Sequence, residues 1–208
     1  MRELNTDLRV VRTKEAIREA LIDLIEEKGF EAITVKDLTT RAKINRGTFY
    51  AHYQDKYDLL TKCEEEFMQE MADRIIKNYP NILADIEAST PTTPPFTIIV
   101  SIFEYIDQNR KFMKAMLGPK GDLSFQTKLK KFVWNSLFES NENPQNPLIK
   151  QENFLVPAEY LISYVASAHI GVLQQWINSD RDESPQEMAR IISTMTMNGP
   201  FFAAGLKK

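Results

Sequence analysis

The sequence of 208 residues contains only one cysteine, two histidines and seven glycines, and these shortages exclude several kinds of site. A single cysteine, Cys63, can form neither an internal disulfide nor a zinc site built from several cysteines. The chain has no glycine-rich phosphate loop and no H-E-x-x-H motif, so it predicts no metal and no cofactor. A catalytic site made of carboxylates stays open, but no motif points to one, and we expect a protein that is not an enzyme.

Long hydrophobic runs are also missing. No stretch of about 18 uncharged apolar residues is present, which predicts no membrane span, and residues 1–12 lack the apolar centre of a signal peptide. Apolar residues make up 43% and charged residues 26% of the chain, which is ordinary for a soluble globular protein. We therefore expect a cytoplasmic protein. The scarcity of glycine and of alternating, strand-like runs favours an all-α fold.

The chain does contain two short predicted helices between residues 34 and 52, each preceded by a capping residue. Thr34 can cap the first helix, with Asp37 at its third position, where a carboxylate meets free backbone N–H groups. Asn45 can cap the second helix, and Asp55 can cap the longer helix that follows. Two short helices with a tight connection, the second rich in hydrogen-bonding side chains, are typical of a helix-turn-helix.

The charge distribution agrees with this motif. The whole chain carries a net charge of −3, which taken alone argues against nucleic acid, since domains that bind it are usually basic. Between residues 36 and 56, however, five basic residues meet two acidic ones. The sequence therefore predicts an acidic protein with one basic face, located at the helix-turn-helix.

These residues resemble a known family. The run from Thr13 to Leu60, above all I-T-V-K-D-L and R-G-T-F-Y-A-H-Y-Q-D-K-Y-D-L-L, is similar to the DNA-binding domain of TetR-like transcriptional regulators, and it covers about a quarter of the chain. The resemblance implies an all-α fold with a helix-turn-helix domain at 1–60 and a helical regulatory and dimerisation domain at 61–208. It also implies a homodimer that binds an inverted-repeat operator in double-stranded DNA.

The family pattern, matched position by position, gives nine candidate DNA-binding residues. Two fall on the supporting helix, six on the recognition helix and one at the start of the next helix: Lys36 and Thr40; Arg46, Gly47, Thr48, Tyr50, Ala51 and His52; and Lys56. We expect Arg46 to read a base, because a guanidinium can pair bidentately with guanine. Gly47 would let the backbone approach DNA and Thr48 would offer its methyl or hydroxyl, while Tyr50, His52 and Lys56 would contact phosphates.

Two aromatic residues within the motif are expected in the core instead: Phe49 and Tyr53. A first helix is predicted from Thr13 to Lys28 and is stopped by Gly29. The residues before it form either a frayed terminus or a basic arm, with Arg2, Arg9 and Arg12, that touches phosphates or the minor groove.

The remaining chain predicts further helices interrupted by two breaks. Helices are expected at about 55–79 (ending before Pro80), 96–108, 112–117, 123–139, 154–178 and 184–199. The breaks are residues 80–95, with four prolines and at most one helical turn at 82–88, and residues 140–153, which we expect to form a mobile loop or a partly disordered segment. Cys63 is expected to be a buried, inert thiol, and His169 a core or interface residue.

The last two helices have alternative uses. They are amphipathic, and the first carries the small residues Ala166, Ser167, Ala168 and Gly171, which suits a four-helix dimer interface. They could instead complete the core of one protomer. The resemblance favours the dimer.

A small-molecule pocket is the last expectation. Its candidate lining is aromatic or methionine: Phe103, Met113, Met116, Phe125, Phe132, Tyr160 and Tyr164. The same residues could fill an ordinary helical core. The resemblance implies a repressor that leaves its operator when an effector binds in such a pocket. The alternative is an activator or co-regulator whose C-terminal domain docks a partner protein.

Overall fold

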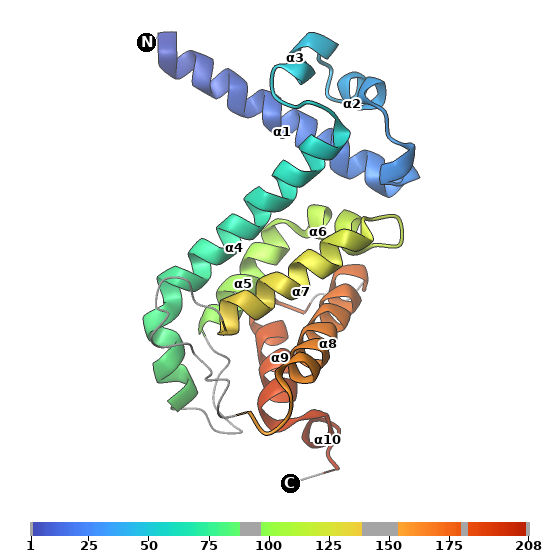
Figure 1. Ribbon diagram of the computed structural model, residues 1–208. Helices are drawn as coiled ribbons and strands as arrows, with labels where there is room; N and C mark the ends of the chain where they lie inside the picture. The colour runs from blue at the N-terminus through green and yellow to red at the C-terminus, as the bar shows by residue number, and fades with distance from the viewer. Residues whose placement is uncertain (1, 88–96, 139–153, 180–182, 207–208) are drawn as a thin grey trace. The chain divides into compact units, whose positions relative to one another are not determined.

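In the computed structural model, residues 2–87, 97–138, 154–179 and 183–206 are described (Figure 1). Every regular element within these ranges is a helix, so the all-α prediction is confirmed. The elements, in order, are α1 (Arg2–Lys28), a 3-10 turn (Phe30–Ala32), α2 (Val35–Arg41), α3 (Arg46–Tyr50), α4 (Lys56–Glu87), α5 (Thr97–Gln108), α6 (Arg110–Leu117), α7 (Leu123–Phe138), α8 (Ala158–Asn178), α9 (Pro185–Asn198) and α10 (Pro200–Ala203). No described helix has the length and apolar content needed to span a membrane.

The chain divides into two compact units that interleave along the sequence. Unit 1 comprises residues 1–67 and 111–125, and unit 2 comprises residues 68–110 and 126–208. Helices α4, α6 and α7 therefore each contribute to both units. The expected functional boundary after residue 60 stays a prediction, because it concerns which residues bind DNA and not how the chain packs.

The core of unit 1 explains why its very short helices form. The apolar stripe of α1 is buried at Ile17, Leu21 and Ile25. Leu38 of α2 and Phe49 of α3 are buried as well, and α2 packs against both α1 and α3. A helix of five residues such as α3 is not stable in isolation. Burying one phenylalanine side chain contributes roughly 1.5–3 kcal/mol, so α3 is held by its tertiary contacts.

A second part of this core joins α6 and α7 to α4. Phe67, Phe112 and Phe125 form a cluster with ring centroids 5.3 to 6.3 Å apart. Cys63 is 3% exposed, and burial raises the pKa of its thiol to about 12. The prediction that Cys63 is buried is confirmed, and the raised pKa favours the inert thiol.

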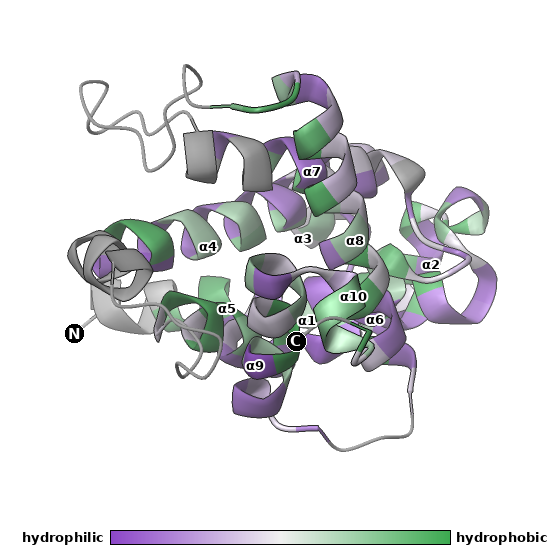
Figure 2. Cartoon of the chain, turned by 90° about the horizontal axis from the view of Figure 1, so that it is seen from below, coloured by the Kyte–Doolittle hydropathy of each residue, from purple (hydrophilic) through white to green (hydrophobic). Residues whose placement is uncertain are grey.

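Unit 2 is organised around the apolar helix α5 and the tryptophan of α8. The ring of Phe103 lies 5.3 Å from the ring of Trp176. The Arg110 guanidinium sits 4.9 Å from the Trp176 ring centroid and donates to the Trp176 carbonyl at 2.8 Å. Figure 2 shows hydrophobic residues along much of α5. His169 is half-buried, 2.9 Å from the Thr196 hydroxyl, and burial lowers its pKa.

Two predicted helix ends are wrong. Helix α1 begins at Arg2 and not at Thr13, because no glycine or proline interrupts the preceding residues and a packed helix extends readily in the N-terminal direction. Thr13, the expected start, is interior, and its hydroxyl donates to the Arg9 carbonyl at 2.8 Å. Helix α4 runs through Pro80 to Glu87, since a proline inside a helix removes one hydrogen bond but does not always end it.

Smaller differences concern the last helices. Helix α8 begins at Ala158, with Pro157 as the residue before it. The short helix α10 was not predicted, and it follows Gly199, whose φ of 82° ends α9. The remaining prolines of the first predicted break and the whole of the predicted loop at 140–153 lie outside the described residues.

Candidate nucleic-acid interface

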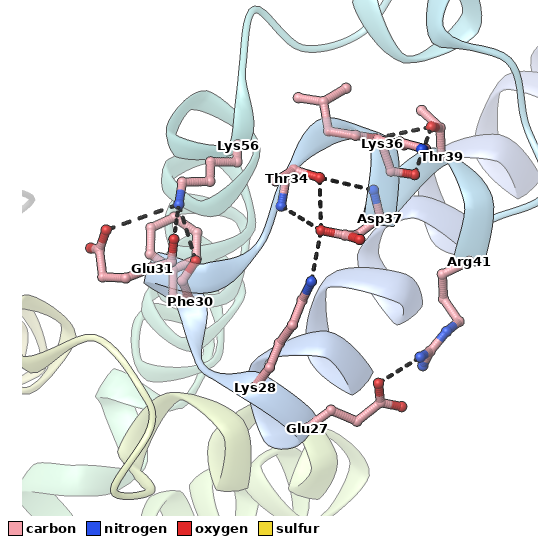
Figure 3. A network of polar contacts seen from close by, with 11 residues as sticks. Glu27, Lys28, Phe30, Glu31, Thr34, Lys36, Asp37, Thr39, Arg41 and Lys56 are labelled. Atoms are coloured by element: carbon pink, nitrogen blue, oxygen red, sulfur yellow. Dashed lines mark hydrogen bonds and ion pairs between the residues drawn. The ribbon is translucent and has the colours of Figure 1, made fainter.

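Helix α2 starts with the predicted capping box, and the structure ties this box to α1 (Figure 3). The Asp37 carboxylate accepts hydrogen bonds from the Thr34 backbone N–H at 2.9 Å, the Thr34 hydroxyl at 2.7 Å and the Lys28 ammonium at 2.7 Å. The bonds from Lys28 and then Thr34 hold the pKa of Asp37 well below its usual range. The start of α2 is therefore fixed to the end of α1.

The turn between α2 and α3 uses a lysine where glycine is usual. Lys43 has a φ of 55°, the left-handed conformation that costs most residues roughly 1–2 kcal/mol. Its N–H donates to the Thr40 carbonyl at 3.3 Å, and the Ile44 N–H donates to the Thr39 carbonyl at 3.0 Å. These are the two bonds of a Schellman motif, so the strained residue closes α2 and sets the entry into α3.

Helix α3 is capped by Asn45, as predicted. The Asn45 side-chain oxygen accepts from the Thr48 N–H at 2.7 Å and from the Thr48 hydroxyl at 3.1 Å. A Cβ added at Gly47 would lie 3.3 Å from the same oxygen. A side chain at position 47 would thus crowd the cap as well as any partner of the helix.

The candidate residues of α3 separate into two faces. Arg46, Gly47, Tyr50 and Ala51 are exposed and share one side of the helix. Phe49 is 0% exposed, and Tyr53, in the turn that follows α3, is 5% exposed, which confirms both as core. Thr48 and His52 are half-buried between the two faces. On α2, Lys36 and Thr40 are exposed four residues apart, while Leu38 and Thr39 are buried.

The cations around the motif also fall into two groups. The outer cations, Lys36, Lys43 and Arg46, are exposed, and within the described residues their side chains have no hydrogen bond or ion pair. The inner cations are engaged in the fold: Lys28 with Asp37, Arg41 with Glu27 at 2.6 Å and Asp23 at 3.4 Å, Lys62 with Asp58 at 2.9 Å, and Lys56. Of these two groups, the outer cations are the ones that present free charge to a partner.

Lys56 is used differently from the sequence expectation. Its ammonium donates to the carbonyls of Phe30 at 3.1 Å and Glu31 at 2.9 Å, and it lies 4.8 Å from the Phe30 ring centroid (Figure 3). The side chain is 14% exposed. The expected phosphate contact stays a prediction, while the observed contacts favour a role in holding the turn between α1 and α2 against α4.

The start of α4 completes the motif. Asp55 caps it, since its carboxylate accepts from the N–H groups of Tyr57 and Asp58 at 2.8 Å each. The Asp58 carboxylate in turn accepts from the Gln54 N–H at 2.9 Å. Asp58 and the inner cations Lys28 and Lys62 were missed from the sequence, and the partner of Lys28, Asp37, becomes its neighbour only after folding. Spacing of four residues between Asp58 and Lys62 was the one available signal.

The seven pocket candidates do not form one group. Met113, Met116 and Phe125 are at most 1% exposed and belong to unit 1. Phe103 is buried and Phe132 half-buried in unit 2. Tyr160 and Tyr164 of the same unit are 69% and 61% exposed on α8. No group of three or more metal-ligating side chains occurs among the described residues.

Two family models match the chain. The model described as bacterial regulatory proteins of the tetR family matches residues 17–63, which include α2 and α3. The model described as the C-terminal region of transcriptional regulators matches residues 94–198.

Individual relatives also match the chain. The chain is 39% identical over 82 residues to the uncharacterized HTH-type transcriptional regulator YxbF of Bacillus subtilis, covering 38% of this chain and 22% of the relative. It is 23% identical over 168 residues to the uncharacterized HTH-type transcriptional regulator YerO of the same organism, covering 79% and 55%. The chain thus spans about a fifth to about a half of the length of these relatives.

Solved structures resemble the whole fold. A TetR transcriptional regulator of Streptococcus agalactiae has a TM-score of 0.59 at 21% identity, covering 93% of this chain and 98% of that one. A TetR-family regulator of Syntrophomonas wolfei has a TM-score of 0.59 at 17% identity, covering 94% and 96%. At these identities the likeness concerns the fold alone.

Proposed function

Because the chain belongs to the TetR family of bacterial transcriptional regulators, we propose that it acts as a homodimeric repressor that leaves its operator when a small molecule binds. The DNA-binding surface of this proposal is the outer face of α2 and α3, which carries Lys36, Thr40, Arg46, Tyr50 and Ala51 at its exposed positions.

One observation carries the DNA-binding assignment. The outer cations have no partner within the described protomer, although acidic side chains are close enough to pair every inner cation. Unpaired lysines and arginines lower the cost of binding a phosphate backbone, because no intramolecular ion pair must first be broken. Arg46, in the first turn of α3, is the proposed base reader, and Lys36 and Lys43 are proposed phosphate contacts.

The homodimer is supported by an open face of α8. Its exposed positions beyond the charged Glu159 at the first turn recur at helical spacing and are uncharged: Tyr160, Ser163, Tyr164, Ser167, Ala168, Gly171 and Gln175. A Cβ at Gly171 would meet nothing within 4 Å. A face of this composition, with tyrosines beside small residues, suits close packing against its own symmetry mate.

The interface can be tested without disturbing the protomer. Ala168→Glu places a charge on the α8 face, and Thr127→Glu places the same charge on an exposed position of α7. We expect the first variant to sediment as a monomer and the second as a dimer. Dimers from both variants would exclude this face as the interface.

The effector is proposed to bind in unit 2, where Phe103 and Phe132 supply aromatic surface. Tyr160 and Tyr164 suit the dimer face better, because more than half of each side chain is exposed. A regulator that docks a partner protein is the alternative. The effector-controlled repressor and the partner-docking regulator differ in one outcome. Only the effector-controlled repressor predicts that a small molecule releases the DNA in the purified system.

The whole proposal is tested by selecting bound sequences from a random duplex library. A dimeric reader should enrich an inverted repeat, with half-sites one helical turn or a multiple of it apart. That operator then serves to screen small molecules for release. If no sequence is enriched, the assignment as an operator-binding repressor is wrong.

A further inference from the structure

The first half of α1 extends beyond the packed part of unit 1. Among residues 8–16 no side chain is buried, and Ile17 is the first core residue of the helix. The family match also begins at residue 17. Figure 1 shows the first turns of α1 clear of the other helices of unit 1. At 1.5 Å per residue, Arg9 lies about 12 Å before Ile17 along the helix axis.

The register of α1 shows which side this extension presents. Arg9, Arg12, Asp23 and Glu27 fall on one stripe of the helix, because seven residues make about two turns and three or four make about one. Near the end of α1, Asp23 and Glu27 on this stripe bind Arg41 of α2. The stripe therefore lies on the side of α1 that the helix-turn-helix covers.

The charge of the stripe reverses along the helix. Its C-terminal half is acidic and is neutralised by Arg41, whereas its N-terminal half carries Arg9 and Arg12. Both arginines are exposed, and neither guanidinium has a hydrogen bond or ion pair with another side chain between residues 8 and 87 or in the later described ranges. Like the outer cations, Arg9 and Arg12 therefore carry positive charge that no acidic side chain in these ranges pairs, and they lie on the side of α1 that faces the helix-turn-helix.

We propose that Arg9 and Arg12 bind the phosphate backbone of the DNA beside the half-site that α3 reads, and this rests on the proposed function. The major groove is about 12 Å wide, so an extension of about that length reaches from a groove-reading motif to the strand that bounds the groove. A guanidinium matches phosphate geometry with two parallel hydrogen bonds. The contact adds affinity and register but no base specificity.

Salt dependence tests the contact directly. The double variant Arg9→Gln/Arg12→Gln keeps good helix formers in α1. Each lost phosphate contact lowers the slope of log K against log salt by about 0.9. Between 50 and 200 mM salt, the affinity of the wild type should therefore fall about tenfold more than that of the double variant, on the selected operator and on a random duplex alike.

Lys14→Gln is the matched control. Lys14 is exposed and lies two residues after Arg12, on the opposite side of α1. Lys14→Gln should leave the slope of log K against log salt unchanged. Arg12→Gln also removes one positive charge, but it should lower the slope by about one. An unchanged slope in the double variant, or an equal drop from Lys14→Gln, would overturn the proposal.

Amide hydrogen exchange gives a second readout. An unpacked half-helix opens easily, so operator binding should slow exchange at residues 8–16 in the wild type but not in the double variant. Equal protection in both would also contradict the contact. Failure of this proposal can be distinguished from failure of the proposed function. The proposed function fails if the wild type enriches no sequence. The salt slope on a random duplex reports on the two arginines whether or not a sequence is enriched.

Discussion

The outer and inner cations of unit 1 occupy the same short region of the chain, yet the inner ones are paired within the fold and the outer ones are not. Lys28, Arg41 and Lys56 hold α1, the following turn and α2 together, while Lys36, Lys43 and Arg46 point to no partner within the described residues. The surplus of positive charge between residues 36 and 56 therefore overstates the charge available to DNA. What matters for binding is which charges the fold leaves unpaired.

The largest expected effect is on the outer side, at Arg46. Arg46→Ala should relax the preference at one position of each operator half-site by about 1–3 kcal/mol. The free energy of unfolding should change by no more than about 0.5 kcal/mol, because the exposed side chain has no hydrogen bond or ion pair within the described residues. Selection from a random library with wild type and variant measures the first quantity. An unchanged preference at every position would remove Arg46 from the base-reading role.

On the inner side, Lys56→Ala should destabilise the protein by about 1–2 kcal/mol, because two carbonyls lose a charged donor. Urea unfolding with and without the substitution measures this loss. Lys36→Ala, the matched outer lysine, should leave the midpoint almost unchanged. Equal midpoints for Lys56→Ala and wild type would break the distinction between the two groups.

A smaller change in the free energy of unfolding, this time a stabilisation, is expected at Lys43. Lys43→Gly should stabilise the protein by about 0.5–1 kcal/mol, because glycine adopts the left-handed conformation without the steric cost of a Cβ. Lys43→Ala removes the same charge but keeps the strain. If both variants stabilise equally, the gain comes from the charge and not from the backbone.

The least pronounced effect is a pH dependence at Asp37. The folded protein lowers the pKa of this carboxyl, so its contribution to stability is complete above the ordinary pKa of an aspartate and is lost as pH falls towards the folded value. Asp37→Asn should therefore destabilise the protein at pH 7, and the difference from wild type should shrink below about pH 4. Urea midpoints of both proteins between pH 7 and pH 2.5 measure it. A difference that grows on acidification would contradict the assignment.

The parts of the fold that depend on neighbours in sequence could be predicted from it. Thr34, Asn45 and Asp55 cap helices at the predicted positions because a cap needs only the next three residues. The core positions of α1, Ile17, Leu21 and Ile25, recur at helical spacing, which is likewise a local feature of the sequence. Phe49 and Tyr53 were separable from their exposed neighbours by the family pattern.

The parts that depend on tertiary contacts could not be predicted. Arg41 and Lys56 looked like their unpaired neighbours, because their partners lie 14 to 26 residues away in the chain. The start of α1 and the passage of α4 through Pro80 were missed for a related reason, since a helix held by packing elsewhere tolerates weak local signals. The pocket candidates shared a composition but were assigned to two units by the fold.

The most direct test of this division is the salt dependence of operator binding in Lys36→Ala and Lys56→Ala, measured where both variants are folded. The division predicts that Lys36→Ala lowers the slope of log K against log salt by about one, while Lys56→Ala leaves it unchanged. A slope lowered by Lys56→Ala and untouched by Lys36→Ala would show that the inner lysine contacts the DNA and the outer one does not, which contradicts the account.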